Sequence, residues 1–322
     1  MSYDQAAEAD FDAIPVVDVT GIHDDANLPA IGEALVAAAQ ASGFFYLSGH
    51  GVKAGLRADA FAASRRFFAL PEAEKATVAV DQTQRGWMAT GMTKFASAKV
   101  PDAKEVFFWG WDYAADDPDL LAGAPLMAHN KWPDGAGADL RDGIEPYYLE
   151  TVALGRRVLA ALAVGLGRAA DFFEAAFANP LARGQLVYYP PMDDADRVAE
   201  RFGAAPHTDF GTLTMLAQDN TGGLQVLSPS GAWVEAPPIP DTYVCNIGDL
   251  LQHWTAGQLK STVHRVINRC AGERYSIPVF CDPASRWVID PSDFGGAVDA
   301  VPLTAGEHIA KRNAGTFSQY KA

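Results

Sequence analysis

Cysteine is scarce in this chain of 322 residues, which contains only Cys245, Cys270 and Cys281. The number is odd and no two form a C-x-x-C pair, so we expect no disulfide framework and a reducing, cytoplasmic location. The longest apolar run, residues 158–167, is too short to cross a bilayer. The first ten residues are acidic and lack the apolar segment of a secretory signal peptide. The sequence therefore predicts a protein with no membrane partner.

Basic residues are also few, because 25 Lys and Arg face 40 Asp and Glu, for a net charge of −15. An acidic surface repels phosphate backbones and anionic lipids, so nucleic acid is not an expected partner. Hydrophobic residues make up 49% of the chain, enough for one large or two modest cores. Internal repeats, low-complexity tracts and linker-like stretches are absent from the sequence. We expect one integrated unit, of unknown oligomeric state.

The apolar pattern changes from helical to strand-like along the chain. Apolar periodicity predicts helices over residues 28–42, 53–68, 145–166 and 169–177, with early strands at 14–19 and 44–47. Residues 80–145 are rich in Gly, Pro, Asp and aromatics and are expected to form loops and short strands. From residue 184 onward, short β-rich runs alternate with turn residues, at 185–189, 212–217, 224–227, 233–236, 243–247, 261–267 and 275–280.

This rhythm of short strands predicts an α+β fold with a two-sheet antiparallel jelly roll, also called a double-stranded β-helix, as its core. The preceding helices are expected to pack on one outer face of the roll. Gly222-Gly223 and residues 228–231 are predicted to be hairpin turns.

Three residues in the strand-rich half have the spacing of a metal site. His207 and Asp209 form an H-x-D motif that opens an apolar run, and His264 lies among β-branched residues further along. Two imidazoles and one carboxylate hold Fe(II) on one face and leave positions open for oxygen chemistry. A second H-x-D, at His23 and Asp25, lies in a polar stretch with no matching distal His, and we interpret it as accidental.

The sequence predicts an anion site shortly after the distal histidine. Arg274 and Ser276 lie two residues apart in an otherwise apolar strand, so their side chains share one face. A buried arginine needs an anion to offset its desolvation. The distal carboxylate of a co-substrate would supply that anion, gripped by the bidentate fork of the guanidinium.

Motifs in a fixed order carry a resemblance to a known family. The chain resembles the Fe(II)/2-oxoglutarate-dependent oxygenases, in the branch that includes isopenicillin N synthase and the plant-type soluble dioxygenases. The similar segments are IPVVD at 14–18, GFFYLSGHGV at 43–52, NKWP at 130–133, YYPP at 188–191, HTDFGTLT at 207–214, GGLQV at 222–226, NIGD at 246–249 and RYS at 274–276. These segments are distributed along nearly the whole chain. They identify the family far more specifically than they identify a substrate.

The resemblance implies a non-haem enzyme that uses Fe(II), 2-oxoglutarate and O₂. It assigns residues 1–145 to an N-terminal dioxygenase region and 146–322 to a helix, the jelly-roll core at about 181–285 and a C-terminal segment. His207, Asp209 and His264 would bind the metal, and Arg274, Ser276 and Tyr189 the co-substrate. Leu216, Leu224 and Val266 would form the walls of the co-substrate pocket, although aliphatic residues of this kind are equally expected in any core.

Two positions depart from the family pattern. Ala256, in WTAG at 254–257, stands where relatives commonly have Asn, and the change is expected to loosen a turn. Val187 replaces an Asn that is common before YYP in plant members, a change expected to alter packing around the co-substrate. Neither position is a predicted metal ligand.

The substrate is predicted less directly. The family commonly covers the iron with loops of the N-terminal half, here the stretch with Arg85, Trp87, Met92, Lys94 and Phe95, and Phe210 and Thr316-Phe317 would complete the pocket. Two cations among aromatics suggest a small molecule with an apolar body and a carboxylate, such as an amino-acid or peptide derivative. The alternative is that Arg85 and Lys94 are ordinary solvated loop charges.

Three functions are compatible with these residues. The first is a 2-oxoglutarate-dependent hydroxylase or desaturase acting on a small molecule. The second is an oxidase of the isopenicillin N synthase type, or an ethylene-forming type of enzyme that departs from the usual 2-oxoglutarate stoichiometry. The third is a metal- or ligand-binding module without turnover, against which the complete set of ligands argues.

Overall fold

A computed structural model describes residues 14–268, 272–299 and 301–320 of the chain. The acidic N-terminal residues and Cys270 lie outside the described residues. Cys245 and Cys281 are buried free thiols, in line with the expected lack of a disulfide framework. No helix in the described part of the chain is long and apolar enough to cross a membrane.

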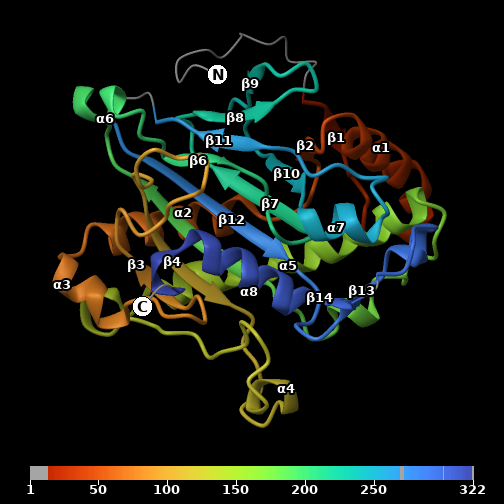
Figure 1. The fold of residues 1–322 in the computed structure, drawn as a ribbon, viewed down its shortest axis with the longest axis horizontal. Coiled ribbons are helices and arrows are strands. Elements are labelled where there is room, and N and C mark those ends of the chain that lie inside the picture. Colours follow the sequence, from red (N-terminus) through yellow and green to blue (C-terminus); the bar gives the residue numbers. More distant parts are fainter. Residues whose placement is uncertain (1–13, 269–271, 300, 321–322) are drawn as a thin grey trace.

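Two sheets form the core of the fold (Figure 1). The larger sheet has the order β1-β2-β10-β7-β12-β5-β4-β3 and is antiparallel except for the β1–β2 pair. Its strands are Val16–Asp18, Phe44–Ser48, Tyr243–Ile247, Leu213–Gln218, Arg274–Cys281, Arg183–Tyr189, Glu105–Gly110 and Gly86–Met88. The smaller sheet has the order β6-β11-β8-β9, with strands Ala204–His207, His264–Val266, Leu224–Leu227 and Trp233–Glu235. A separate pair, β13 (Val288–Ile289) and β14 (Leu303–Thr304), lies outside both sheets.

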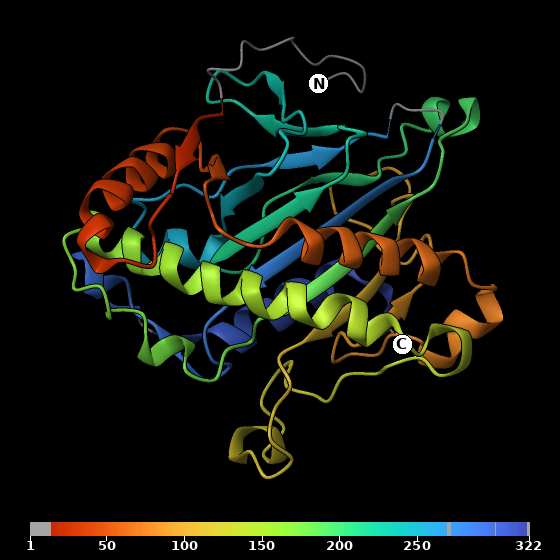
Figure 2. The same cartoon turned by 180° about the vertical axis from the view of Figure 1, so that it is seen from behind.

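Three long helices cover the outer face of the larger sheet, as predicted. Figure 2 shows α5 (Leu140–Gly165) running across this face, with α1 (Leu28–Ala41) and α2 (Ala54–Phe68) beside it. The helix α5 begins five residues before the predicted start because Leu140 and Ile144, both buried, extend its apolar face beyond Pro146. The other helices are α3 (Glu72–Lys75), α4 (Pro118–Leu121), α6 (Asp194–Val198), α7 (Asp249–Trp254) and α8 (Ala305–Thr316).

The interior between the two sheets is apolar and is separate from the core beneath the helices. Alternate residues of one strand face the two cores, because the side-chain period of a strand is two. In β4, Val106 and Phe108 join the interior of the roll, whereas Phe107 and Trp109 pack under the helices. This alternation decides which side chains reach the interior of the roll.

Most predicted elements are confirmed, and β8 and β10 have the predicted bounds. The helix predicted at 169–177 is wrong, because this segment forms turns bonded from residue i to i−3, and only Ala175–Phe177 is a short 3₁₀ helix. The turn at 228–231 joins the paired strands β8 and β9 and is confirmed. The Gly222-Gly223 hairpin is wrong, because β7 and β8 belong to different sheets and the two glycines, with φ of 80° and 87°, carry the chain between them.

Candidate functional site

The two predicted histidine ligands face each other across an antiparallel strand pair. His207 ends β6 and His264 begins β11, and the register places them directly opposite. Their ring centroids are 4.3 Å apart. Asp209 follows β6, and its Oδ1 lies 3.9 Å from Nε2 of His207 and 3.7 Å from Nε2 of His264. Within the described ranges these three residues are the only group of His, Cys, Asp or Glu placed to hold a metal ion.

Backbone carbonyls fix both imidazoles in the orientation that metal binding requires. Nδ1 of His207 lies 2.7 Å from the carbonyl oxygen of Ala205, and Nδ1 of His264 lies 3.2 Å from that of Thr262. With the proton on Nδ1, each ring donates to its carbonyl and leaves the Nε2 lone pair directed at the carboxylate. Each Nε2 is then unprotonated and available to bind a metal ion.

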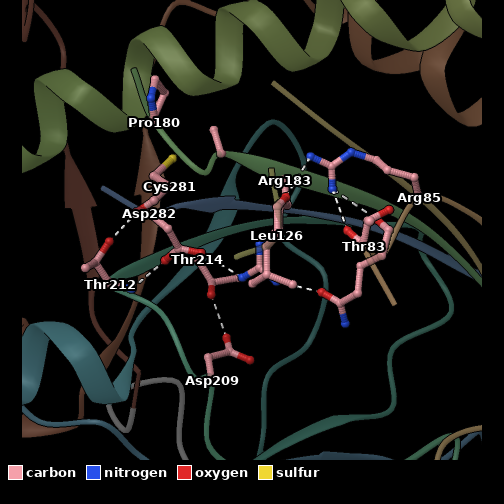
Figure 3. Close-up of polar contacts among 12 residues, drawn as sticks. Thr83, Arg85, Leu126, Pro180, Arg183, Asp209, Thr212, Thr214, Cys281 and Asp282 are labelled. Atoms are coloured by element: carbon pink, nitrogen blue, oxygen red, sulfur yellow. Dashed lines mark hydrogen bonds and ion pairs between the residues drawn. The ribbon is translucent and has the colours of Figure 1, made fainter. Parts of the chain in front are cut away.

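The carboxylate of Asp209 is held by its other oxygen. Thr214 Oγ1 and Asn246 Nδ2 donate to Oδ2 at 2.6 and 2.7 Å, and Figure 3 shows the Thr214 contact. Thr214 and Asn246 are cross-strand neighbours in β7 and β10. Because both donors engage Oδ2, Oδ1 remains free to face the two imidazoles.

The charge states of these ligands suit a divalent cation. Burial, followed by the proximity of His264, lowers the pKa of His207, so its imidazole is neutral near pH 7. Burial acts to raise the pKa of Asp209, but the proximity of His264 and the hydrogen bonds from Thr214 and Asn246 outweigh it and leave the pKa below its usual range. Neutral imidazoles and an ionised carboxylate are the forms that bind metal.

A cavity of about 80 Å³ joins this triad to the predicted anion site, and we call it the Arg274 cavity. Its lining includes every predicted co-substrate residue, Tyr189, Leu216, Leu224, Val266, Arg274 and Ser276, together with all three metal ligands.

The guanidinium of Arg274 has spare hydrogen-bonding capacity. The residue is fully buried, its Nε donates to the carbonyl of Gly222 at 2.7 Å, and its Nη2 lies 3.3 Å from Oε1 of Gln218. Tyr189 pairs with Arg274 across β5 and β12, and its ring centroid lies 4.7 Å from the guanidinium carbon. Nη1 has no hydrogen-bond partner in the described part of the chain. A buried cation with an unmet donor suits a carboxylate ligand.

Family models match both halves of the chain. Residues 14–135 match the family model described as the N-terminal region of non-haem dioxygenases in morphine synthesis. Residues 184–283 match the model of the 2OG-Fe(II) oxygenase superfamily. The 2-oxoglutarate-dependent dioxygenase citB of Monascus ruber is 34% identical over 316 residues, which cover 95% of this chain and 96% of that protein. The chain belongs to the 2OG-Fe(II) oxygenase superfamily.

Other relatives agree with this assignment. The clavatol oxidase claD of Penicillium crustosum is 34% identical, over 95% of this chain and 97% of that protein. A full-length Neurospora crassa protein, solved in complex with alpha-KG and thymine, superposes with a TM-score of 0.82 at 28% identity, covering 96% of this chain and 99% of that one. The predicted family, jelly-roll fold, dioxygenase activity and use of Fe(II), 2-oxoglutarate and O₂ are thereby confirmed.

A second cavity of about 80 Å³ is lined by two of this oxygenase's metal ligands, His207 and Asp209. Of the eight predicted substrate residues, Phe95, Phe210 and Phe317 line it. We call it the Phe95 cavity. The ring of Phe95 stacks on His207 with centroids 4.4 Å apart.

The other five line neither cavity, and they are Arg85, Trp87, Met92, Lys94 and Thr316. Arg85 is fully buried and donates to the carbonyls of Thr83, Gln84 and Leu126, and Figure 3 shows its contact with Thr83. It is therefore neither a solvated loop charge nor a lining residue. Trp87 packs in the core beneath the helices, where its Nε1 donates to Glu105 at 2.8 Å.

Lys94 is exposed to solvent, which agrees with the alternative interpretation of this residue as a surface charge. The reason for the placement of Trp87 is the strand period. Met88, its neighbour in β3, faces the interior of the roll, so Trp87 must face the helices. Arg85 has the same parity as Trp87.

One cation beside the metal site, Lys104, was not predicted from the sequence. Lys104 lines both cavities. It precedes β4 by one residue and has the parity of Val106 and Phe108, which face the interior. That parity was a readable signal, because residues 104, 106 and 108 belong to one face of a strand.

Proposed function

We propose that this dioxygenase hydroxylates or desaturates a small molecule at Fe(II) held by His207, Asp209 and His264. In this proposal Arg274 and Ser276 bind the distal carboxylate of 2-oxoglutarate. The observation that carries it is the fully buried Arg274, which has an unmet Nη1 donor and lines the same cavity as the triad.

Bound Fe(II), 2-oxoglutarate and O₂ supply oxidative decarboxylation to succinate and CO₂, with oxidation of a substrate C–H bond. The side chains of this protein hold and orient these groups. The two imidazoles and the carboxylate of Asp209 hold the metal on one face. Leu216, Leu224 and Val266 exclude water from the Arg274 cavity, which strengthens the pairing of Arg274 with a carboxylate.

Small-molecule oxidation is also what the relatives suggest. The Neurospora crassa structure holds alpha-KG together with thymine, and a second relative, JOX2, was solved with 2OG, Fe and JA at 26% identity and a TM-score of 0.77. Small organic molecules occupy both of these relatives. An oxidase that dispenses with 2-oxoglutarate would leave the buried cation of Arg274 without an anion, which argues against that alternative.

An anaerobic titration tests the proposal. Fe(II) followed by 2-oxoglutarate should give a visible charge-transfer absorption in the wild-type protein, and aerobic turnover with substrate should release succinate. His264→Ala should bind iron weakly and lose oxidation, because a three-ligand site has no spare ligand. His23→Ala is the matched control, since His23 belongs to the exposed second H-x-D motif. Wild-type oxidation by His264→Ala, or no absorption change with 2-oxoglutarate, would overturn the assignment.

A further inference from the structure

Lys104 occupies the junction of the two cavities. The Arg274 cavity and the Phe95 cavity share five lining residues, Lys104, Gln185, His207, Asp209 and Phe280. Of these, Lys104 is the only cation. A ligand in the Phe95 cavity would therefore lie next to both the metal ligands and one ammonium group.

The ammonium of Lys104 forms an ion pair with a buried carboxylate. Its Nζ lies 3.2 Å from Oδ2 of Asp102, and the side chains are 11% and 0% exposed. Oδ1 of Asp102 accepts from the backbone N–H of Ala205 at 3.1 Å. Nζ also lies 5.6 Å from the ring centroid of Phe95. The ammonium is thus fixed between a buried carboxylate and an aromatic wall of the cavity.

Only the positively charged member of this ion pair lines the cavities. Asp102 lines neither of them, whereas Lys104 lines both. The neighbouring Arg183 is arranged in the same way, because it lines the Phe95 cavity while its partner Asp282, at 2.7 Å, does not. Among the residues that the structure describes, the only carboxylate lining either cavity is Asp209, which the metal would neutralise.

Lys104 also has unused hydrogen-bonding capacity. An ammonium carries three N–H donors, and Asp102 is its one ion-pair partner within the described ranges. Water is partly excluded from the site, so a carboxylate placed in the cavity would form a charge-assisted hydrogen bond of more than surface strength. The remaining walls include three phenylalanines, Phe95, Phe210 and Phe317, which suit an apolar body.

We propose that the substrate is a small carboxylic acid with an apolar body, whose carboxylate binds Lys104 while the body fills the Phe95 cavity. This inference rests on the proposed function and names the substrate class of the same site. It assigns to Lys104, the residue before β4, the role that the sequence suggested for Arg85 and Lys94.

The test uses matched acids and amides as probes. Phenylacetate and phenylacetamide, 4-methylbenzoate and 4-methylbenzamide, and hexanoate and hexanamide are titrated calorimetrically into the anaerobic protein loaded with Fe(II) and 2-oxoglutarate. We expect at least one acid to bind about 10–100-fold more tightly than its amide. That preference should disappear in Lys104→Met and persist in Lys99→Met, where an exposed lysine of the same segment is changed. Lys104→Arg should keep the preference.

A second variant shows whether a lost preference for acids is caused by misfolding. Lys104→Met leaves Asp102 buried without its partner, so the double variant Lys104→Met with Asp102→Asn removes both charges together. It should remain folded by thermal denaturation and show no preference for acids. Equal binding of acids and amides by the wild type, no binding of any acid, or an acid preference that survives in the double variant would each overturn the proposal.

The co-substrate provides a further discriminating measurement. If Lys104 instead served a carboxylate of 2-oxoglutarate, Lys104→Met would weaken 2-oxoglutarate binding, and the proposal would be wrong. If the wild type gave no charge-transfer absorption with 2-oxoglutarate, the proposed function itself would fail. Normal absorption without any acid preference would refute only the substrate class.

Discussion

Replacing Thr214 by Val tests whether the hydrogen bonds to Asp209 set the affinity for iron. The hydroxyl of Thr214 donates to Oδ2 over 2.6 Å, and the side chain is buried, so water has little access to replace it. Val keeps the branched shape that suits strand β7 and removes only the donor. A hydrogen bond to a charged group contributes about 1.5–3 kcal/mol, while Asn246 still donates to the same oxygen.

That free energy corresponds to a loss of about 10–100-fold in Fe(II) affinity, the range found when the partners of metal ligands are removed. The measurement is an anaerobic Fe(II) titration against a competing chelator. Thr212→Val is the matched control, because that hydroxyl bonds to the carbonyl of Cys281 and not to Asp209. An affinity for Fe(II) within twofold of the wild type, in a folded Thr214→Val protein, would refute the reasoning.

Three further substitutions have defined outcomes. Arg274→Leu should raise the KM for 2-oxoglutarate about a hundredfold with Fe(II) affinity unchanged, as steady-state kinetics and metal titration would show; an unchanged KM would remove Arg274 from the co-substrate site. Arg85→Met should lower the free energy of unfolding by about 1–3 kcal/mol, because three buried carbonyls lose their donor, and leave both KM values unaltered; a changed substrate KM at full stability would contradict this. Ala256→Gly should raise the free energy of unfolding by roughly 0.5–1 kcal/mol in denaturant titrations, because Ala256 has φ +50°; a lower free energy of unfolding would contradict the strain argument.

Ala256 also shows what a departure from a family pattern can mean. The missing Asn was expected to loosen a turn. The structure gives the physical reason that Asn suits this position, since the backbone is left-handed and Asn tolerates that region better than Ala. The chain continues directly through Gly257, with φ +78°, so the turn is kept with one strained residue.

The metal site could be predicted because its geometry is largely local. The H-x-D spacing places two side chains at one strand end, and only the pairing of β6 with β11 had to be supplied by the fold. The co-substrate residues follow the same logic, because Arg274 and Ser276 share a strand face. The helix α8 was also readable in principle, since Thr304 accepts from the backbone N–H of Glu307 and donates its hydroxyl to the Glu307 carboxylate, in the T-x-x-E sequence typical of a helix start.

Local sequence spacing could not identify the cation that lies beside the metal site. Which of Arg85, Lys94 and Lys104 reaches the metal depends on how β4 and β3 add to the edge of the large sheet, beside β5. Such long-range pairing is not encoded in local spacing. Once β4 is placed, the strand period alone selects Lys104 for the interior and excludes Trp87.

The N-terminal half of the chain also supports the strand that carries a metal ligand. Strand β6, which carries His207, lies at the edge of the smaller sheet, where backbone groups would otherwise be unpaired. Residues of the segment before β4 bond to that edge, because Asp102 accepts from the N–H of Ala205 and Ser97 donates to the carbonyl of Pro206. The same segment carries Phe95, stacked on His207, and ends at Lys104. A ligand that binds Lys104 therefore contacts the segment that fixes a metal ligand, so substrate and iron should each raise the affinity for the other by the same factor.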